Sequence, residues 1–404
     1  MTKPTLSQPC TLRTTCPYCG VGCGVLATPD GTGGMTIKGD PDHPANQGRL
    51  CSKGSALAET ITTEDRLLYP VVAGGRASWD DALNLVAQKF RDTIAKHGPD
   101  SVAFYVSGQL LTEDYYVANK LMKGFIGSAN IDTNSRLCVA STVAGLRRAF
   151  GTDTVPGQYT DLEQADLIVL TGSNLAWCHP VLYQRIAAAK KARPHMKVVN
   201  IDPRRTATSD LADLHLPIRP GGDVALFNRL LLDIHEQDAM DTAYICDHVE
   251  GFDAALDAAS RCDTSVTGLS ETELRTFCDL WIKSEKVVTV FSQGVNQSSA
   301  GSDKVNAILN CHLATGRIGK PGCGPFSVTG QPNAMGGREV GGLANMLACH
   351  LDIENAEHRS AVKTFWNAPA MPVEAGLKAV DMFKAVGDGR IRAIWIICTN
   401  PVVS

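Results

Sequence analysis

The sequence is poor in aromatic residues and has little excess charge of either sign. Aromatic residues make up 6% of the 404 positions, and 38 Lys and Arg side chains stand against 42 Asp and Glu, a formal net charge of −4. Nucleic-acid-binding proteins usually carry a basic surface and aromatic side chains that stack on bases. We therefore expect no nucleic-acid partner. Since no stretch approaches the roughly 18 consecutive apolar residues of a membrane helix, we also expect no membrane partner.

The N-terminal segment lacks the features of an export signal. Residues 1–19 contain neither an apolar core nor a pair of adjacent arginines. The fourteen cysteines are therefore not typical of the disulfide framework of a small secreted protein. We expect a cytoplasmic protein in which the cysteines near the N-terminus bind a metal group.

Apolar residues, 44% of the chain, recur in runs of strand length that alternate with helical patterns. Alternating strands and helices indicate βαβ units with parallel sheets, and there are too many units for one small sheet. We expect two α/β domains after a small, loop-rich domain within residues 1–70. The strand-length runs are 102–106, 167–170, 197–201, 287–291 and 393–398, and the helical patterns include 180–193, 224–235 and 302–315.

Four of the expected strands end in small polar residues, in the segments 171–174, 202–206, 292–294 and 399–401. In open α/β sheets, ligands bind at the carboxyl ends of the strands. Small residues at those ends let backbone N–H groups approach a phosphate. The four segments together predict an extended, nucleotide-like ligand.

The N-terminal cysteines follow the pattern Cys16-x2-Cys19-x3-Cys23, with Cys51 after a further 27 residues. Four thiolates at this spacing suit a [4Fe–4S] cluster, in which each iron takes one sulfur ligand from the protein. Three alternatives remain open from spacing alone. They are a dithiol redox pair formed by Cys16 and Cys19, a structural zinc site, and unliganded core cysteines.

Lys53 follows Cys51 by two residues. A fixed cation beside an iron–sulfur cluster raises its reduction potential, because it attracts the added electron. We expect Lys53 to have this role, and the alternative is a solvated surface lysine.

Several motifs together resemble the molybdopterin oxidoreductase family, whose members with bis(molybdopterin guanine dinucleotide) include nitrate reductases and formate dehydrogenases. The motifs are the cysteine pattern, the sequence Asn134-Ser-Arg-Leu-Cys138-Val-Ala-Ser, and the loops TGSNLAWCHP (171–180), DPRRT (202–206) and RPGGD (219–223). QPNAMGGREV (331–340) resembles most closely the assimilatory nitrate reductases of bacteria. The resemblance extends over essentially the whole chain.

The resemblance implies a role for individual residues. Cys16, Cys19, Cys23 and Cys51 match the cluster ligands, Lys53 the lysine between cluster and pterin, and Cys138 the thiolate ligand of molybdenum. A soft thiolate suits a molybdenum already bound by dithiolene sulfurs. The other matching cofactor contacts are Gln109, Asn134, Thr171, Gly172, Ser173, Asn174, Leu175, Ala176, Trp177, Cys178, Asp202, Pro203, Arg204, Arg205, Thr206, Gly221, Gly222, Asp223, Gln293, Gln297 and Asn400.

Asp223 and Arg338 each have a second interpretation. The Asp223 carboxylate can accept two hydrogen bonds from a guanine, or it can cap the helix expected over 224–235. Arg338 is our candidate for binding an oxyanion substrate, because a guanidinium matches planar oxyanions. The alternative for Arg338 is a salt bridge to Glu339 or to another carboxylate.

The resemblance implies reduction of nitrate to nitrite in nitrate assimilation, with electrons that arrive through the cluster. Formate dehydrogenases of this family carry a histidine directly after the metal-binding residue, whereas Val139 stands there in this chain. Oxidation of formate needs a base, but transfer of an oxygen atom from nitrate does not. The alternatives are a formate dehydrogenase or another oxyanion reductase of the family, or a non-catalytic iron–sulfur electron-transfer subunit. The expected electron donor is an NADH-linked flavoprotein, a ferredoxin or a flavodoxin.

The expected domains follow from the same resemblance. Residues 1–68 form the [4Fe–4S] domain, residues 69–138 with 325–404 form a discontinuous first dinucleotide-binding domain, and residues 139–324 form the second. Both dinucleotide-binding domains are expected to be Rossmann-like. We expect that the C-terminal β-rich domain of the family is absent from these 404 residues.

Overall fold

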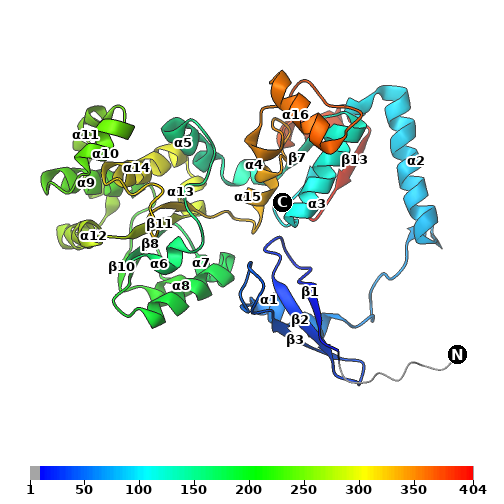
Figure 1. The fold of residues 1–404 in the computed structure, drawn as a ribbon. Coiled ribbons are helices and arrows are strands. Elements are labelled where there is room, and N and C mark those ends of the chain that lie inside the picture. The colour runs from blue at the N-terminus through cyan, green and yellow to red at the C-terminus, as the bar shows by residue number, and fades with distance from the viewer. Residues whose placement is uncertain (1–9, 404) are drawn as a thin grey trace. The chain divides into compact units, whose positions relative to one another are not determined.

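The computed structural model describes residues 10–403. The chain divides into two compact units (Figure 1). Unit 1 consists of residues 1–136 and 331–404, and unit 2 consists of residues 137–330. None of the helices within residues 10–403 is long and apolar enough to cross a membrane.

Unit 1 combines a small antiparallel sheet near its N-terminus with a parallel sheet flanked by helices. Its strands are β1 (Leu12–Thr15), β2 (Gly24–Pro29), β3 (Met35–Gly39), β4 (Val71–Val72), β5 (Gly75–Arg76), β6 (Val102–Val106), β7 (Ile131–Thr133) and β13 (Ala393–Ile396). Its helices are α1 (Ser52–Ser55), α2 (Trp79–His97), α3 (Thr112–Asn119), the π-helix η3 (Lys120–Ile126), α15 (Ala334–Glu339), α16 (Ala356–Trp366) and α17 (Ala379–Gly387). Helix α4 (Ser135–Cys138) begins in unit 1 and ends in unit 2.

The parallel sheet of unit 1 has the strand order β13-β6-β7. Side chains of β6 alternate between its two faces, as the period of a strand requires. Val102, Phe104 and Val106 pack with residues of α2, α3 and η3, while Ala103 and Tyr105 pack with α17. The sheet is therefore covered by helices on both faces, as parallel sheets are.

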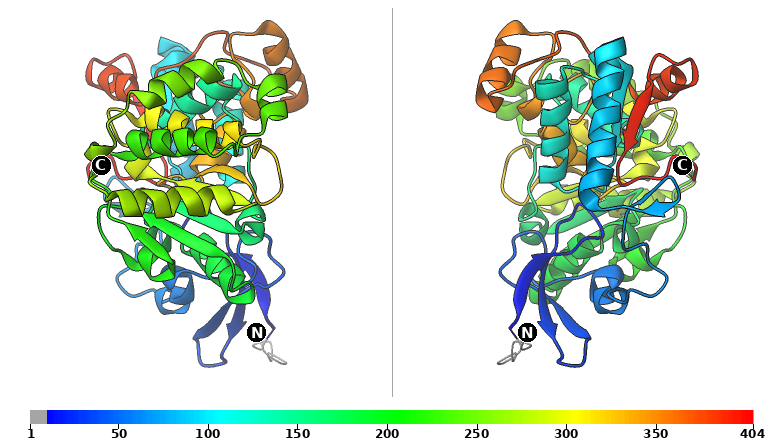
Figure 2. Two further views of the ribbon diagram at one scale, coloured as in Figure 1. Left: turned by 90° about the vertical axis from the view of Figure 1, so that its left-hand side faces the viewer. Right: turned by 90° about the vertical axis from the view of Figure 1, so that its right-hand side faces the viewer.

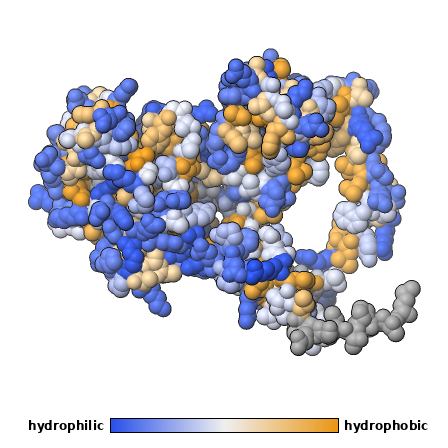
Figure 3. All heavy atoms as spheres, in the orientation of Figure 1, coloured by the Kyte–Doolittle hydropathy of each residue, from blue (hydrophilic) through white to orange (hydrophobic). Residues whose placement is uncertain are grey.

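Local sequence signals mark both ends of helix α2. The Ser78 hydroxyl accepts a hydrogen bond from the Asp81 N–H at 3.1 Å, and Gly98 ends the helix with φ of 85°. A left-handed residue after a helix is most often glycine. Large side chains of α2, among them Trp79, Leu83 and Val86, remain exposed, and the surface of this helix is orange in places (Figure 3).

Unit 2 contains a five-stranded parallel sheet in the order β10-β9-β8-β11-β12. Its strands are β8 (Leu167–Thr171), β9 (Lys197–Ile201), β10 (Leu214–Leu216), β11 (Val287–Phe291) and β12 (Gly324–Ser327). Its helices are α5 (Ala140–Phe150), α6 (Asp161–Gln164), α7 (Leu175–Cys178), α8 (Pro180–Ala192), α9 (Asp223–Glu236), α10 (Thr242–His248), α11 (Phe252–Ser260), α12 (Glu271–Lys283), α13 (Gln293–Asn296) and α14 (Gly301–Ala314).

Helices cover both faces of the unit 2 sheet. Leu167 and Val169 of β8 belong to a core formed with α9, α12 and α14, and Ile168 and Leu170 face a second core with α8. Helices α9 and α14 lie side by side (Figure 2). This doubly wound arrangement confirms the predicted α/β class with parallel sheets.

The predicted strands and helices agree with the structure apart from their ends. The strand expected over 393–398 ends at Ile396. Cys398 adopts a φ of 55°, which is incompatible with an extended strand.

Candidate functional site

The four N-terminal cysteines lie in two loops around the small antiparallel sheet. Cys16 follows β1 directly and Cys23 precedes β2, and the Cys16 N–H donates to the Cys23 carbonyl at 2.8 Å. Cys51 is the N-cap residue of α1, where its sulfur accepts from the Gly54 N–H at 3.5 Å. N–H groups aimed at a ligating sulfur favour the reduced form of an iron–sulfur cluster.

Burial and neighbouring charges raise the pKa of two of the four thiols. Burial raises the pKa of the Cys23 thiol to about 12, and the charges of Cys19, Cys16 and Cys51 raise it further. Burial also raises the pKa of Cys19, whereas the ammonium of Lys53 lowers it. Buried thiols such as Cys19 and Cys23 ionise readily only when a cationic group binds the thiolates. Within residues 10–403, no three Cys, His, Asp or Glu side chains converge as a single-ion site.

The loop between Cys19 and Cys23 packs closely against other residues of unit 1. A Cβ atom on Gly20 would lie 2.2 Å from the Leu110 carbonyl oxygen and 2.5 Å from the Asn333 Cβ. Glycine is therefore required at this position. The contact brings the cysteine loop to the 331–340 segment.

Three predicted cofactor contacts follow the parallel strands of unit 1. Gln109 follows β6, Asn134 follows β7, and Asn400 follows β13. Because these strands are parallel, their carboxyl ends meet at one edge of the sheet. The Asn134 amide bridges to the β6 loop, since its oxygen accepts from the Gly108 N–H at 3.3 Å and its nitrogen lies 3.4 Å from the Ser107 hydroxyl.

Arg338 lies on α15 and is 3% exposed. Its Nη1 donates to the Met335 sulfur at 3.6 Å. The carboxylate Oε1 of the neighbouring Glu339 lies 2.9 Å from Nε2 of His350.

Cys138, the predicted molybdenum ligand, is 9% exposed at the end of α4. The Gly330 N–H donates to its sulfur at 3.1 Å. Gln297 Nε2 donates to the carbonyls of Leu137 at 2.7 Å and of Cys138 at 2.8 Å. With its amide oriented to satisfy both of its polar atoms, Gln293 donates to the Cys138 carbonyl at 2.9 Å and accepts from the Gly330 N–H at 2.7 Å. The thiol is thus held by residues from two further loops.

A cavity of about 420 Å³ lies at the carboxyl ends of the unit 2 strands, and Gln293, Gln297 and Gly330 form part of its wall. The loops after β8, β9 and β11 all reach it, as the sequence predicts. Ten of the predicted cofactor contacts line it. They are Gly172, Asn174, Cys178, Asp202, Pro203, Arg204, Gly221, Asp223, Gln293 and Gln297.

The other predicted residues of these loops do not line this cavity. Thr171 and Leu175 are fully buried, and Trp177 is 74% exposed. Thr206 is the N-cap residue of the next helical turn, where its hydroxyl accepts from the Thr208 N–H at 3.2 Å. The remaining ones are Ser173, Ala176, Arg205 and Gly222.

Two glycines bring the β8 and β11 loops together at the cavity. The Gly294 N–H donates to the Gly172 carbonyl at 2.9 Å. A Cβ atom on Gly172, which has φ of +55°, would lie 2.8 Å from the Gly294 Cα. The backbones of the two loops touch because neither residue carries a side chain.

Asp223 does not cap helix α9, so the capping interpretation is wrong. Gly222 occupies the N-cap position and Asp223 is the first residue of the helix. The Asp223 carboxylate pairs instead with Lys304 of α14, with 2.7 Å between Oδ2 and Nζ. The two side chains are 9% and 5% exposed, and both line the cavity.

Sequence reasoning missed Lys304, although the sequence contains a signal for it. Lys304 occupies the apolar face of α14, four residues before the buried Ile308. A lysine on the buried face of an amphipathic helix needs a partner of opposite charge. Arg219 and Ser292, which lie within the predicted loop segments, also line the cavity, as do Ser298 and Gly330, which lie outside them.

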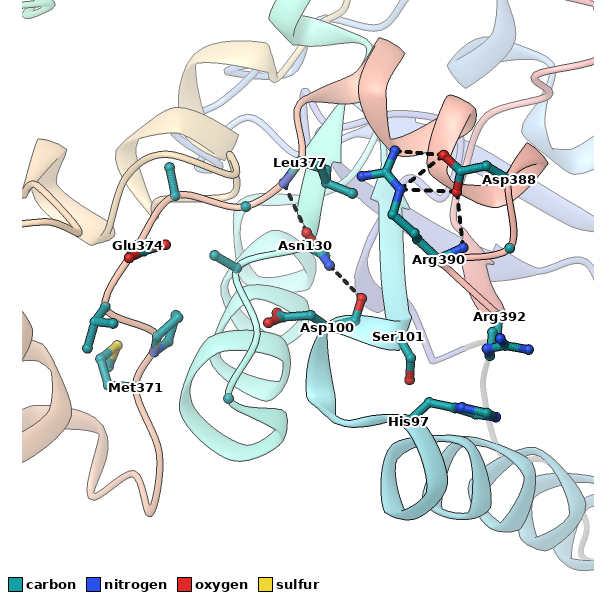
Figure 4. A pocket seen from close by; sticks show the side chains of 17 residues that line it. His97, Asp100, Ser101, Asn130, Met371, Glu374, Leu377, Asp388, Arg390 and Arg392 are labelled. Atoms are coloured by element: carbon teal, nitrogen blue, oxygen red, sulfur yellow. Dashed lines mark hydrogen bonds and ion pairs between the residues drawn. The ribbon is translucent and has the colours of Figure 1, made fainter.

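A second cavity, of about 960 Å³, lies in unit 1 near the amino ends of β6 and β13 (Figure 4). Asn130 bridges its wall, since its amide donates to the Asp100 carbonyl at 3.0 Å and accepts from the Leu377 N–H at 2.9 Å. Arg390 is paired there with Asp388 at 2.8 Å. None of the predicted cofactor contacts lines this cavity.

The fold and the site are those of the iron–sulfur oxidoreductases that bind dinucleotide cofactors. This class combines a cysteine-rich N-terminal domain with two parallel α/β sheets that carry polar loops at their strand ends. Residues 11–63 match the molybdopterin oxidoreductase Fe4S4 domain, and residues 66–404 match the molybdopterin oxidoreductase family. The chain belongs to the molybdopterin oxidoreductase family. The expected [4Fe–4S] cluster and molybdopterin cofactor are thereby confirmed.

Known proteins similar to this chain are longer than it. The chain is 54% identical to a nitrate reductase of Klebsiella oxytoca, over 97% of this chain and 45% of that protein. It is 39% identical to a periplasmic nitrate reductase of Desulfovibrio desulfuricans, over 96% and 54%. The structure of acetylene hydratase from Pelobacter acetylenicus shares the fold, with a TM-score of 0.62 and 24% identity over 74% of this chain and 42% of that one. The chain thus spans about half the length of these curated relatives.

Proposed function

We propose that the complete protein, of which this chain spans one part, reduces nitrate to nitrite. Nitrate, two protons and two electrons give nitrite and water. The observation that carries the proposal is the environment of Cys138, a buried thiol that Gln293, Gln297 and Gly330 hold beside the unit 2 cavity. The 54% identity to a nitrate reductase supports the substrate.

The residues present fit the proposed cofactors. Cys16, Cys19, Cys23 and Cys51 would hold the [4Fe–4S] cluster, and the Cys138 thiolate would bind molybdenum. The polar loops at the carboxyl ends of the parallel strands would hold a bis(molybdopterin guanine dinucleotide). When bound, these groups supply two-electron chemistry with oxygen transfer at molybdenum and one-electron transfer at the cluster.

Side chains of the chain itself orient the Cys138 thiol and supply a cation for the substrate, and no basic side chain follows Cys138 directly. Gln297 and Gln293 fix the backbone of Cys138 and so orient its thiol. Residues behind a metal ligand that fix its orientation usually contribute substantially to activity. Arg338 supplies the cation for nitrate. Val139, 1% exposed, offers no base directly after Cys138, which favours nitrate over formate as the substrate.

We also propose an assimilatory role in the cytoplasm. It is supported by residues 331–340, whose sequence QPNAMGGREV resembles that of assimilatory nitrate reductases. A flavoprotein linked to NADH, a ferredoxin or a flavodoxin would then deliver electrons. We retain the division into a cluster domain (1–68) and two dinucleotide domains (69–138 with 325–404, and 139–324) as part of this proposal.

Metal analysis of the complete protein distinguishes an enzyme from an electron-transfer subunit. We expect about four iron and four sulfide per chain, as a cubane requires, together with one molybdenum. Anaerobic purification followed by elemental analysis and acid-labile sulfide determination measures all three. Iron and sulfide without molybdenum would instead support the electron-transfer subunit, and zinc without sulfide would contradict the cluster.

Replacing Lys53 by methionine is expected to lower nitrate reduction about tenfold or more, the loss typical of a residue that tunes a metal site without binding it. Methionine keeps the length of the side chain but removes the charge that lowers the pKa of Cys19. Turnover with a viologen donor measures the effect, and the iron and molybdenum contents should stay at the wild-type level. Lys89→Met on α2 is the matched control. Unchanged turnover in Lys53→Met would make Lys53 a solvated surface lysine.

A further inference from the structure

Lys304 and Asp223 form a buried ion pair in the wall of the unit 2 cavity. The ammonium lies 2.7 Å from Oδ2 of Asp223 and also donates to the Gly294 carbonyl at 3.2 Å. Lys304 therefore connects the start of α9 to the β11 loop, whose Gly294 contacts Gly172 of the β8 loop. A buried carboxylate is tolerated as an anion only beside a cationic partner, and Lys304 is that partner.

The Asp223 carboxylate can accept further hydrogen bonds while it is paired with Lys304. An ionised carboxylate has about four lone-pair sites, and Lys304 occupies one of them on Oδ2. No hydrogen bond of the Asp223 Oδ1 atom occurs within the part of the chain that the structure describes. One edge of Asp223 is thus able to accept two parallel hydrogen bonds while Lys304 holds the other side.

Guanine is the nucleobase that fits such an edge. It presents two adjacent N–H donors, at N1 and at the exocyclic N2, whereas the corresponding edge of cytosine or adenine places a donor beside an acceptor. A carboxylate repels an acceptor, so the same group that binds guanine also rejects the other bases.

We propose that Lys304 is a positioning residue that determines the selectivity of this chain for the guanine form of its dinucleotide cofactor. This inference rests on the proposed function. Lys304 acts through Asp223, whose carboxylate it fixes in place. Loss of the ammonium would leave the carboxylate without the partner that orients it. A carboxylate that turns away no longer opposes both guanine N–H groups, so the preference for guanine falls.

The test uses the complete enzyme, prepared without cofactor and reconstituted with either the guanine or the cytosine dinucleotide form of the cofactor. Bound nucleotide is released by acid and measured as GMP or CMP per chain. The wild-type enzyme should prefer the guanine form about 100-fold or more, as sites with matched polar groups do. In Lys304→Met the preference should fall at least tenfold. Lys191→Met on α8 serves as the control and should keep the wild-type preference.

The ratio of bound GMP to bound CMP distinguishes a positioning role of Lys304 from a merely structural one. A structural role would lower both loadings together, and an unchanged ratio in Lys304→Met would overturn the inference. If Lys304→Met does not fold, Lys304→Gln removes the charge but keeps an N–H donor at this position and leaves Asp223 unchanged. Lys304→Gln should also lose preference for guanine, and full guanine preference in it would overturn the inference. A wild-type enzyme that takes up no guanine dinucleotide would contradict the proposed cofactor instead.

Discussion

Replacing Cys138 by alanine is expected to abolish nitrate reduction by the complete enzyme. The loss should exceed about 100-fold, the upper end of the effect of changing residues that only support a metal ligand. Alanine removes the sulfur that accepts from the Gly330 N–H at 3.1 Å, while Gln297 still binds the backbone carbonyl of position 138. The local fold should therefore persist without the ligand. Viologen-linked nitrate turnover measures the activity.

Replacing a different cysteine, Cys246, by alanine controls for the general effect of removing a thiol. Cys246 is an exposed cysteine on α10 that lines neither cavity described above. Cys246→Ala should keep wild-type activity. In Cys138→Ala the iron and sulfide contents should stay near four per chain, since the cluster cysteines lie in unit 1. Substantial turnover in Cys138→Ala would remove this residue from the metal centre.

Replacing Gly172 by alanine is expected to destabilise unit 2 by about 2–5 kcal/mol. Left-handed backbone costs a residue with a side chain about 1–2 kcal/mol, and forcing an extra methyl group into a packed interior costs about 1–3 kcal/mol. Both apply, because Gly172 has φ of +55° and its new Cβ would lie 2.8 Å from the Gly294 Cα. The β8 and β11 loops would have to separate, and retention of the dinucleotide should fall as well. Urea unfolding followed by circular dichroism measures the stability.

Gly319 provides a control with the same backbone conformation and no crowding. It has φ of +72°, and a Cβ atom there would meet nothing within 4 Å. Gly319→Ala should therefore lose only the conformational contribution of about 1–2 kcal/mol and retain the dinucleotide. Equal losses of stability in the two variants would show that the close approach of the two loops is unimportant.

The pattern of the sequence was sufficient to predict the strands and the edge of the sheet at which the loops meet. Runs such as 287–291 are apolar throughout because both faces of a parallel strand are buried. Small polar residues directly after them marked the loops that line the cavity. These signals are local, so one sequence is enough to detect them.

The partners of charged residues were harder to predict, because they come from distant parts of the chain. Asp223 directly precedes an expected helix, so local statistics offered a cap as the alternative to a guanine contact, yet its partner is Lys304 on a distant helix. Glu339 likewise pairs with His350 and not with a sequence neighbour. Such pairs depend on how helices pack, which hydrophobic periodicity does not specify. The family resemblance, and not periodicity, pointed to Cys138, whose surroundings include Gly330 from a loop 192 positions away.

A comparison of two substrates tests whether the complete protein reduces nitrate. The full-length, cofactor-loaded enzyme is assayed anaerobically with reduced viologen and nitrate, and separately with oxidised viologen and formate. We predict nitrate-dependent oxidation of the dye with one nitrite formed per two electrons, and no formate-dependent reduction, because Val139 supplies no base beside Cys138. Reduction of the dye by formate without oxidation by nitrate would contradict the account.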